Sequence, residues 1–183
     1  MAHKCPVFLG YFLIFPFRKF YQNPEKILGH FIKSGFTILE VGPGMGFFSL
    51  PLAKMTGENG RLICVDVQDG MLSKLKKRAK NAGLSERIQT RLCNEQSLGI
   101  EDLKEKIDFA LAFAVVHELT DASTFFREVF ISLKRGGRLF IAEPKGHISV
   151  NSFDNTLMLA QNCGFKIIEY PSVRQSRAAV LGK

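Results

Sequence analysis

An apolar run, an acid and three alternating glycines follow one another in Thr37-Ile38-Leu39-Glu40-Val41-Gly42-Pro43-Gly44-Met45-Gly46-Phe47. A second apolar run, residues 61–65, ends in Asp66. Glycine lets the backbone approach a ligand closely where a side chain would collide. An acid at the end of the second strand can accept hydrogen bonds from both hydroxyls of a ribose. The two runs together predict a nucleotide-binding crevice.

The spacing of the glycines indicates which kind of nucleotide binds. A dinucleotide site has the pattern G-x-G-x-x-G and holds a pyrophosphate on a helix N-terminus. Here the pattern is E-x-G-x-G-x-G, so the Glu40 carboxylate precedes the first glycine. That charge would repel a pyrophosphate but suits a ligand with a cationic amine. S-adenosylmethionine carries such an amine and a ribose, and it has no phosphate.

These residues resemble a known family. The turn at 40–46 resembles motif I of the class I S-adenosylmethionine-dependent methyltransferases of the small, single-domain, small-molecule type, and residues 65–72 resemble their second motif. The resemblance covers about residues 25–183 and is sharpest at motif I. It implies that the chain is a methyltransferase and that S-adenosylmethionine is its cofactor. The other interpretation is a glycine-rich turn in a different α/β protein.

Length and composition favour one cytoplasmic domain. A chain of 183 residues with 46% hydrophobic content can bury a core of its own. The longest uncharged apolar run, residues 7–17, is too short for a transmembrane segment, which needs roughly 20 residues. We expect a single methyltransferase domain over 1–183, in which 1–24 is a Phe-rich N-terminal lid or arm and 25–183 is the catalytic core.

Apolar runs alternate with amphipathic stretches along the rest of the chain. The runs predict strands at 37–41, 61–66, 87–92, 107–113, 138–142, 165–170 and 177–181. The stretches predict helices at 25–33, 46–56, 70–82, 121–134 and 151–163. This alternation is typical of an α/β fold with a doubly wound, mostly parallel sheet. The family resemblance implies seven strands in a Rossmann-like arrangement, with the last strand antiparallel.

Ligands of such sheets bind beyond the carboxyl ends of the strands. The resemblance implies that Asp66 holds the ribose of the cofactor. It also implies contacts with the methionine part from the residues around the first turn, which are Glu40, Gly42, Gly44 and Gly46.

Five further residues are candidates for the cofactor site. Val67 and Met71 either sandwich the adenine or belong to the ordinary core. The resemblance implies a polar residue against the adenine amine after the third strand, where Asn94 and Glu95 are both available. Phe113 ends the fourth strand, and the backbone beyond it lines the methionine part in the family.

The acceptor side offers two candidate catalytic residues. His117 follows the fourth strand and is either a general base or a structural histidine at the start of a helix. Glu143 follows the fifth strand and could orient the acceptor or act as the base. We assign no metal site, because the potential ligands sit on separate loops without diagnostic spacing and His3 with Cys5 would make only half a site.

Missing motifs favour a small molecule as the acceptor, and we expect it to be apolar or aromatic. After the fourth strand the chain lacks the Pro-Pro-aromatic sequence of adenine-amine methyltransferases and the nucleophilic cysteine of cytosine-carbon enzymes. The net charge of +8 leaves nucleic acid as a partner and an RNA methyltransferase as an alternative. A non-catalytic cofactor-binding module is the other alternative. The sequence does not indicate an oligomeric state.

Overall fold

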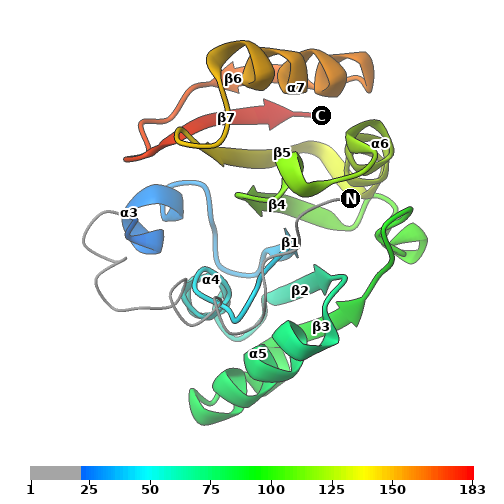
Figure 1. Ribbon diagram of the computed structural model, residues 1–183. Coiled ribbons are helices and arrows are strands. Elements are labelled where there is room, and N and C mark those ends of the chain that lie inside the picture. The colour runs from blue at the N-terminus through cyan, green and yellow to red at the C-terminus, as the bar shows by residue number, and fades with distance from the viewer. Residues whose placement is uncertain (1–21) are drawn as a thin grey trace. The chain divides into compact units, whose positions relative to one another are not determined.

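The computed structural model describes residues 22–183 (Figure 1). Most of the predicted N-terminal lid or arm, and with it His3 and Cys5, lies outside the described residues. The strands form a seven-stranded sheet in the order β3-β2-β1-β4-β5-β7-β6. Their bounds are β1 (Thr37–Val41), β2 (Arg61–Asp66), β3 (Ile88–Leu92), β4 (Ile107–Phe113), β5 (Leu133–Pro144), β6 (Lys166–Glu169) and β7 (Ser176–Gly182).

The helices follow the predicted alternation with the strands. The α-helices are α3 (Pro24–Leu28), α4 (Ser49–Met55), α5 (Asp69–Asn81), α6 (Ala122–Ser132) and α7 (Val150–Asn162). Short 3-10 turns are η1 (Ser85–Arg87), η2 (Glu101–Leu103) and η3 (Val116–Glu118). No helix within residues 22–183 is long and apolar enough to cross a membrane. The predicted α/β fold is confirmed, and β7 is antiparallel to both of its neighbours.

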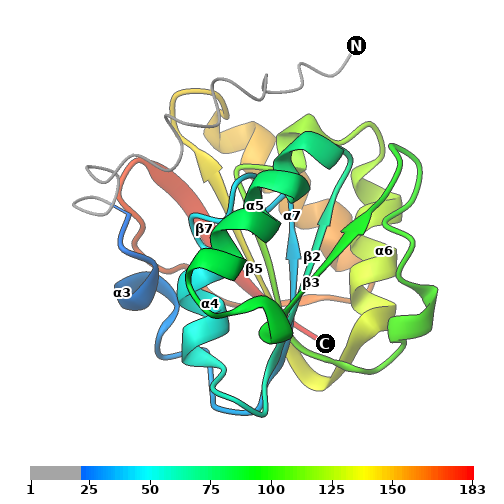
Figure 2. The ribbon, with the colours of Figure 1, turned by 90° about the horizontal axis from the view of Figure 1, so that it is seen from below.

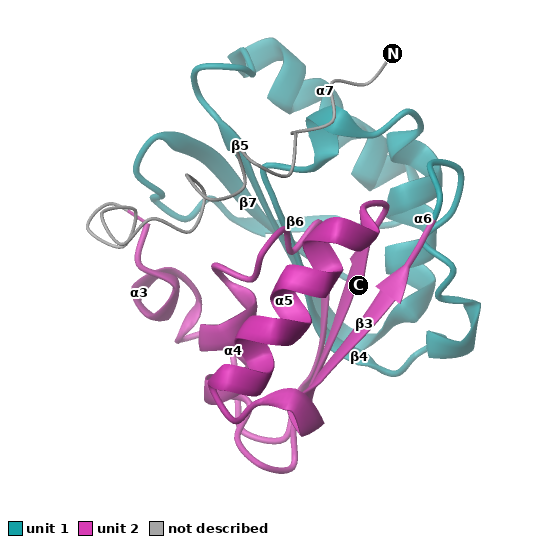
Figure 3. Cartoon of the chain, turned by 60° about the horizontal axis from the view of Figure 1, so that its bottom comes forward, with its two compact units in different colours: residues 1–2, 94–183 teal, residues 3–93 magenta. Residues whose placement is uncertain are grey.

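The described residues divide into two compact units (Figure 3). Residues 22–93, which are unit 2 in the figure, come first in the chain and are called the first unit; residues 94–183, which are unit 1 in the figure, are called the second unit. In the first unit β2 pairs in parallel with β1 and with β3. Residues 62–65 of β2 are almost wholly buried, as expected for a parallel strand covered on both faces. Helices α4 and α5 contact β2, and α5 also contacts β3 (Figure 2).

In the second unit β4 pairs in parallel with β5, and β7 lies between β5 and β6. Helix α6 contacts α7 and β5, while α7 contacts β6. The core between them is aromatic: the ring of Phe165 lies 6.2 Å from that of Phe126 and 5.1 Å from that of Phe130. The antiparallel last strand that the resemblance implies is present as β7, which pairs with β5 and β6.

The helix predicted over 25–33 is shorter than its apolar spacing indicates. Asn23 caps α3 by accepting the N–H of Lys26 at 3.1 Å, but the helix ends at Leu28, next to Gly29. Glycine is among the weakest helix formers. The chain continues in a tight turn in which the Phe31 N–H reaches the Leu28 carbonyl, and Phe31 remains buried. The start of this helix was predicted correctly, and its end was not.

Two other boundaries differ from the prediction. The helix capped by Asp121 stops at Ser132 and not near Lys134, and β5 begins at once with Leu133. The reason is tertiary: Leu133 is fully buried and pairs with Ile107 of β4, which extends the strand before the two glycines at 136–137. Residues 46–48 likewise belong to the turn after β1 and not to α4.

The glycine turn of the first unit is packed tightly against α5. A Cβ atom on Gly46 would lie 2.4 Å from Cδ1 of Leu75, and Gly46 has φ +85°. Gly83 provides a matched control, because its φ is +67° but a Cβ there would meet nothing within 4 Å among the described residues. We expect Gly83→Ala to lower the free energy of unfolding by about 1–2 kcal/mol, the cost of the left-handed conformation alone.

Gly46→Ala should lower the free energy of unfolding by clearly more than Gly83→Ala, because it adds a steric clash to the same conformational cost. Urea denaturation of both variants measures the difference. Equal losses would show that α5 does not constrain the turn.

Candidate functional site

The turn after β1 presents its glycine backbone in two different ways. Gly42, Gly44 and Gly46 all adopt left-handed conformations, with φ of 67°, 53° and 85°. Gly46 faces α5, as described above. A Cβ on Gly44, in contrast, would meet no described atom within 4 Å. Gly46 therefore allows the turn to pack, whereas Gly44 leaves backbone exposed on an open side where a ligand can approach.

Arg78, which also lies on α5, binds the backbone of this turn. Its Nη1 donates a hydrogen bond to the Met45 carbonyl, between the second and third glycines. Burial lowers the pKa of Arg78 from its ordinary value. Lysines surround Arg78 in the sequence of this helix. The structure separates them, because Lys74, Lys76, Lys77 and Lys80 are exposed.

Glu40 is buried beneath the turn, with 3% of its surface exposed. It is the register partner of Cys64 on β2, and the Cys64 thiol donates to Oε2 of Glu40 at 3.6 Å. Burial raises the pKa of Glu40 to about 7, although the Ser49 and Cys64 side chains offset part of this effect. A cation beside this carboxylate would favour its charged form and so offset the electrostatic cost of burying it.

Asp66 ends β2 and is also buried, with 8% exposed. Its Oδ1 accepts the Gln68 N–H at 2.9 Å. Burial raises the pKa of Asp66, while the backbone N–H groups of Gln68, Gly44 and Val67 act in the opposite direction. The influence of Gly44 links this carboxylate to the glycine turn, so the first unit brings both predicted acids to one place.

The remaining cofactor candidates occupy varied positions. Met71 is buried at 2% exposure in α5, whereas Val67 is 36% exposed at the end of β2. Asn94 uses its side-chain oxygen locally, where it accepts the N–H groups of Gln96 and Ser97 at 2.9 and 2.8 Å. Glu95 is exposed and Phe113 is nearly buried at the end of β4. A role of these residues in cofactor binding stays a prediction.

In the second unit the two predicted catalytic residues are hydrogen-bonded to each other. The ring nitrogen Nδ1 of His117 contacts Oε2 of Glu143. The other oxygen of Glu143 accepts the N–H groups of Val116 at 2.9 Å and Val115 at 3.3 Å. Glu143 is 1% exposed and is therefore fixed by these contacts. Its contact with Nδ1 holds the His117 ring in one orientation.

The charge of His117 depends on this carboxylate. The hydrogen bond to Glu143 raises the pKa of His117, burial opposes the rise, and the charges of Glu143 and Glu118 add to it. The His147 ring lies edge-on at 6.0 Å from the His117 ring. Within residues 22–183 no three His, Cys, Asp or Glu side chains form a cluster that could hold a metal ion.

Sequence reasoning missed the residues that hold the site together. No role in the site was assigned to Arg78 or to Leu75 from the sequence. Nothing in their spacing indicated that they contact the glycine turn. Glu143 was identified, but its pairing with His117 depends on β4 and β5 being neighbours in the sheet.

Three features together define a Rossmann-like class I methyltransferase. They are the glycine turn after β1, the buried acid that ends β2 and the antiparallel β7 beside β5. Residues 32–175 match the family described as "Methyltransferase domain". The chain belongs to this family of S-adenosylmethionine-dependent methyltransferases.

Curated relatives of the chain are named as methyltransferases of quinone biosynthesis. The chain is 26% identical over 112 residues to the ubiquinone/menaquinone biosynthesis C-methyltransferase UbiE of Enterobacter sp. (strain 638), and the match covers 61% of this chain and 44% of the relative. UbiE of Salmonella arizonae is 27% identical over the same length. The matched part of the chain thus spans less than half the length of these relatives.

Solved structures share the fold over nearly the whole chain. A SAM-dependent methyltransferase from Aquifex aeolicus superposes with a TM-score of 0.87 at 24% identity, covering 97% of this chain and 98% of its own. A structure from Methanococcus maripaludis, described as a putative S-adenosyl-L-methionine-dependent methyltransferase, gives a TM-score of 0.77 at 20% identity, covering 97% and 90%.

The buried carboxylate of Glu40 predicts a pH-dependent stability. Its pKa of about 7 in the folded protein exceeds the ordinary 4.5, so protonation stabilises the folded state at low pH. This stabilisation is lost as the pH rises from about 4.5 to about 7. Glu40→Gln removes the effect. The free energy of unfolding of the variant, relative to that of the natural protein, should therefore rise by up to about 3 kcal/mol between pH 4.5 and pH 8.

Urea denaturation of both proteins without cofactor, at each pH, measures this gain. A stability difference that does not change with pH would mean that Glu40 is not forced toward its neutral form.

The contact between His117 and Glu143 predicts a raised pKa that NMR can detect. The ring of His117 should titrate above 6.5, because Glu143 favours the imidazolium form. Glu143→Gln should lower this midpoint by more than Glu118→Gln, because Glu143 is hydrogen-bonded to the ring whereas the Glu118 carboxylate lies 4.0 Å from the other ring nitrogen. A midpoint unaffected by Glu143→Gln contradicts the pairing.

Proposed function

We propose that this methyltransferase acts on a small apolar or aromatic acceptor. The open glycine backbone at Gly44, beside the buried carboxylates of Glu40 and Asp66, carries the cofactor part of this proposal. The likeness to UbiE over part of the chain supports a small molecule as the acceptor. The net charge of +8 and the exposed lysines of α5 favour nucleic acid instead.

The residues of the first unit fit S-adenosylmethionine. Gly44 has room for a ligand against its backbone. The Asp66 carboxylate can accept hydrogen bonds from two ribose hydroxyls. Glu40 offers negative charge to a cationic amine and would become ionised in its presence. When bound, the cofactor supplies an activated methyl group on a sulfonium.

The residues of the second unit suit the handling of a proton. With Nδ1 of His117 donating to Glu143, the second nitrogen, Nε2, is left to accept a proton when the ring is neutral. A hydroxyl or acidic carbon of the acceptor would pass its proton to Nε2, which would leave the acceptor atom with the electron pair that takes up the methyl group. The Glu143 carboxylate stabilises the resulting imidazolium. Alignment of the acceptor supplies much of the remaining acceleration.

Asp66→Ala should weaken the binding of S-adenosylhomocysteine, the demethylated cofactor, while the protein stays folded. Charge-assisted hydrogen bonds contribute roughly 1.5–3 kcal/mol, which corresponds to about a 10- to 150-fold loss of affinity. Gly44→Val should bind still more weakly, because its branched side chain fills the open side of the turn. Titration calorimetry measures both.

Asp102→Ala serves as the control, because Asp102 is an exposed aspartate of η2. It should bind S-adenosylhomocysteine like the natural protein. Unchanged affinity in folded Asp66→Ala would place the ribose elsewhere.

The acceptor class is tested by turnover. The protein is incubated with S-adenosylmethionine and a panel of phenols, quinols and aromatic acids, or with RNA, and release of S-adenosylhomocysteine is measured. Release with an aromatic member supports the proposal, and it should fall in His117→Gln. Release with RNA alone, with a steep dependence on salt, would overturn the small-molecule acceptor.

A further inference from the structure

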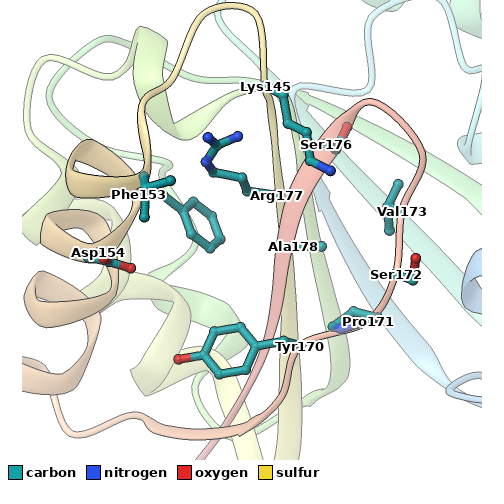
Figure 4. Close-up of a pocket in the computed structure, with 11 residues that line it drawn as sticks. Lys145, Phe153, Asp154, Tyr170, Pro171, Ser172, Val173, Ser176, Arg177 and Ala178 are labelled. Atoms are coloured by element: carbon teal, nitrogen blue, oxygen red, sulfur yellow. The ribbon is translucent and has the colours of Figure 1, made fainter.

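A groove in the second unit lies between α7 and the segment that joins β6 to β7 (Figure 4). Its volume of about 580 Å³ falls in the range of small-molecule sites, about 300–1,000 Å³. Phe153 of α7 and Val173 of the joining segment form buried apolar walls. Tyr170 stands on the rim with 64% of its surface exposed. These side chains suit a flat apolar ring.

Arg177 enters the groove from β7 without a partner among the described residues. Its Nε atom is buried and has no hydrogen-bond partner in residues 22–183. Its register neighbour across the strands is Glu143, but the carboxylate oxygens of Glu143 are already bound to His117 and to backbone N–H groups. A buried donor without an acceptor is costly, so the site favours a ligand that brings one.

The other charges of the groove also favour an anion. Lys145 lines it beside Arg177, and Asp154 of α7 is the one carboxylate among the lining residues. Asp154 is exposed, so water screens its charge, whereas part of the Arg177 guanidinium is withdrawn from water. A guanidinium binds a planar carboxylate through two parallel hydrogen bonds.

We propose that this groove binds an aromatic carboxylate, with its acidic group on Arg177 and Lys145 and its ring against Phe153 and Tyr170. The assignment of this ligand as the methyl acceptor rests on the proposed function. It would make the acceptor an aromatic acid and not a neutral quinol. Arg177 is the register partner of the residue that positions His117, so the acidic group and the candidate base are held by adjacent strands.

A matched pair of probes isolates the charge. 2-Naphthoate and 2-naphthamide have nearly the same shape, and only the first is an anion. Calorimetric titration of the natural protein should show naphthoate binding at least about tenfold more tightly, the size of one charge-assisted hydrogen bond. Arg177→Gln should abolish the preference, and Lys145→Gln should reduce it.

Arg174→Gln is the control, because Arg174 is an exposed arginine of the same joining segment and does not line the groove. It should keep the full preference. Arg177→Lys, which retains the charge but not the planar fork, should keep only part of it. The thermal melting of each variant shows whether it is folded, and Lys145→Gln, at an exposed position, tests the proposal if Arg177→Gln does not fold.

Equal affinity for the two probes, no binding of naphthoate, or an equal loss in Arg174→Gln would overturn the proposal. Titration of the same samples with S-adenosylhomocysteine keeps the two hypotheses apart. Cofactor binding without naphthoate binding leaves the methyltransferase site intact and refutes the groove. Naphthoate binding without cofactor binding supports the groove and refutes the proposed cofactor site.

Discussion

The chain must leave β1 through a turn in which every second residue from 42 to 46 is glycine, and the arrangement of the first unit depends on this constraint. Three glycines in left-handed conformations make the turn possible. Leu75 packs against it where Gly46 leaves room, and Arg78 binds the Met45 carbonyl. Helix α5 therefore helps to fix the turn, and the side with Gly44 stays open to a ligand.

Two carboxylates are buried next to this turn, and their burial is an electrostatic cost to the folded protein. Burial raises the pKa values of both Glu40 and Asp66. Proteins retain such groups where a ligand can offset the cost. A ligand with a cationic amine and ribose hydroxyls offsets it at both positions, whereas a pyrophosphate would add repulsion. The same residues thus explain the absence of the dinucleotide pattern and the membership in the methyltransferase family.

Most strands could be predicted because buried parallel strands read as continuous apolar runs: β1, β2 and β4 begin and end where the sequence indicated. The boundary between α6 and β5 could not, because Leu133 joins the strand through its pairing with Ile107. The surroundings of Arg78 and of Arg177 could not be predicted from the sequence either. Whether an arginine faces solvent, a carbonyl or an empty groove depends on which elements meet in three dimensions, and the local pattern does not record this.

The most direct test of the central claim, that the turn and its two acids select a cationic nucleoside over a dinucleotide, is a pair of calorimetric titrations of the natural protein at pH 7.5. One uses S-adenosylmethionine and the other uses NAD. The account predicts saturable binding of S-adenosylmethionine and none of NAD over the same concentration range. Binding of NAD with equal or higher affinity, or no binding of S-adenosylmethionine, would contradict it.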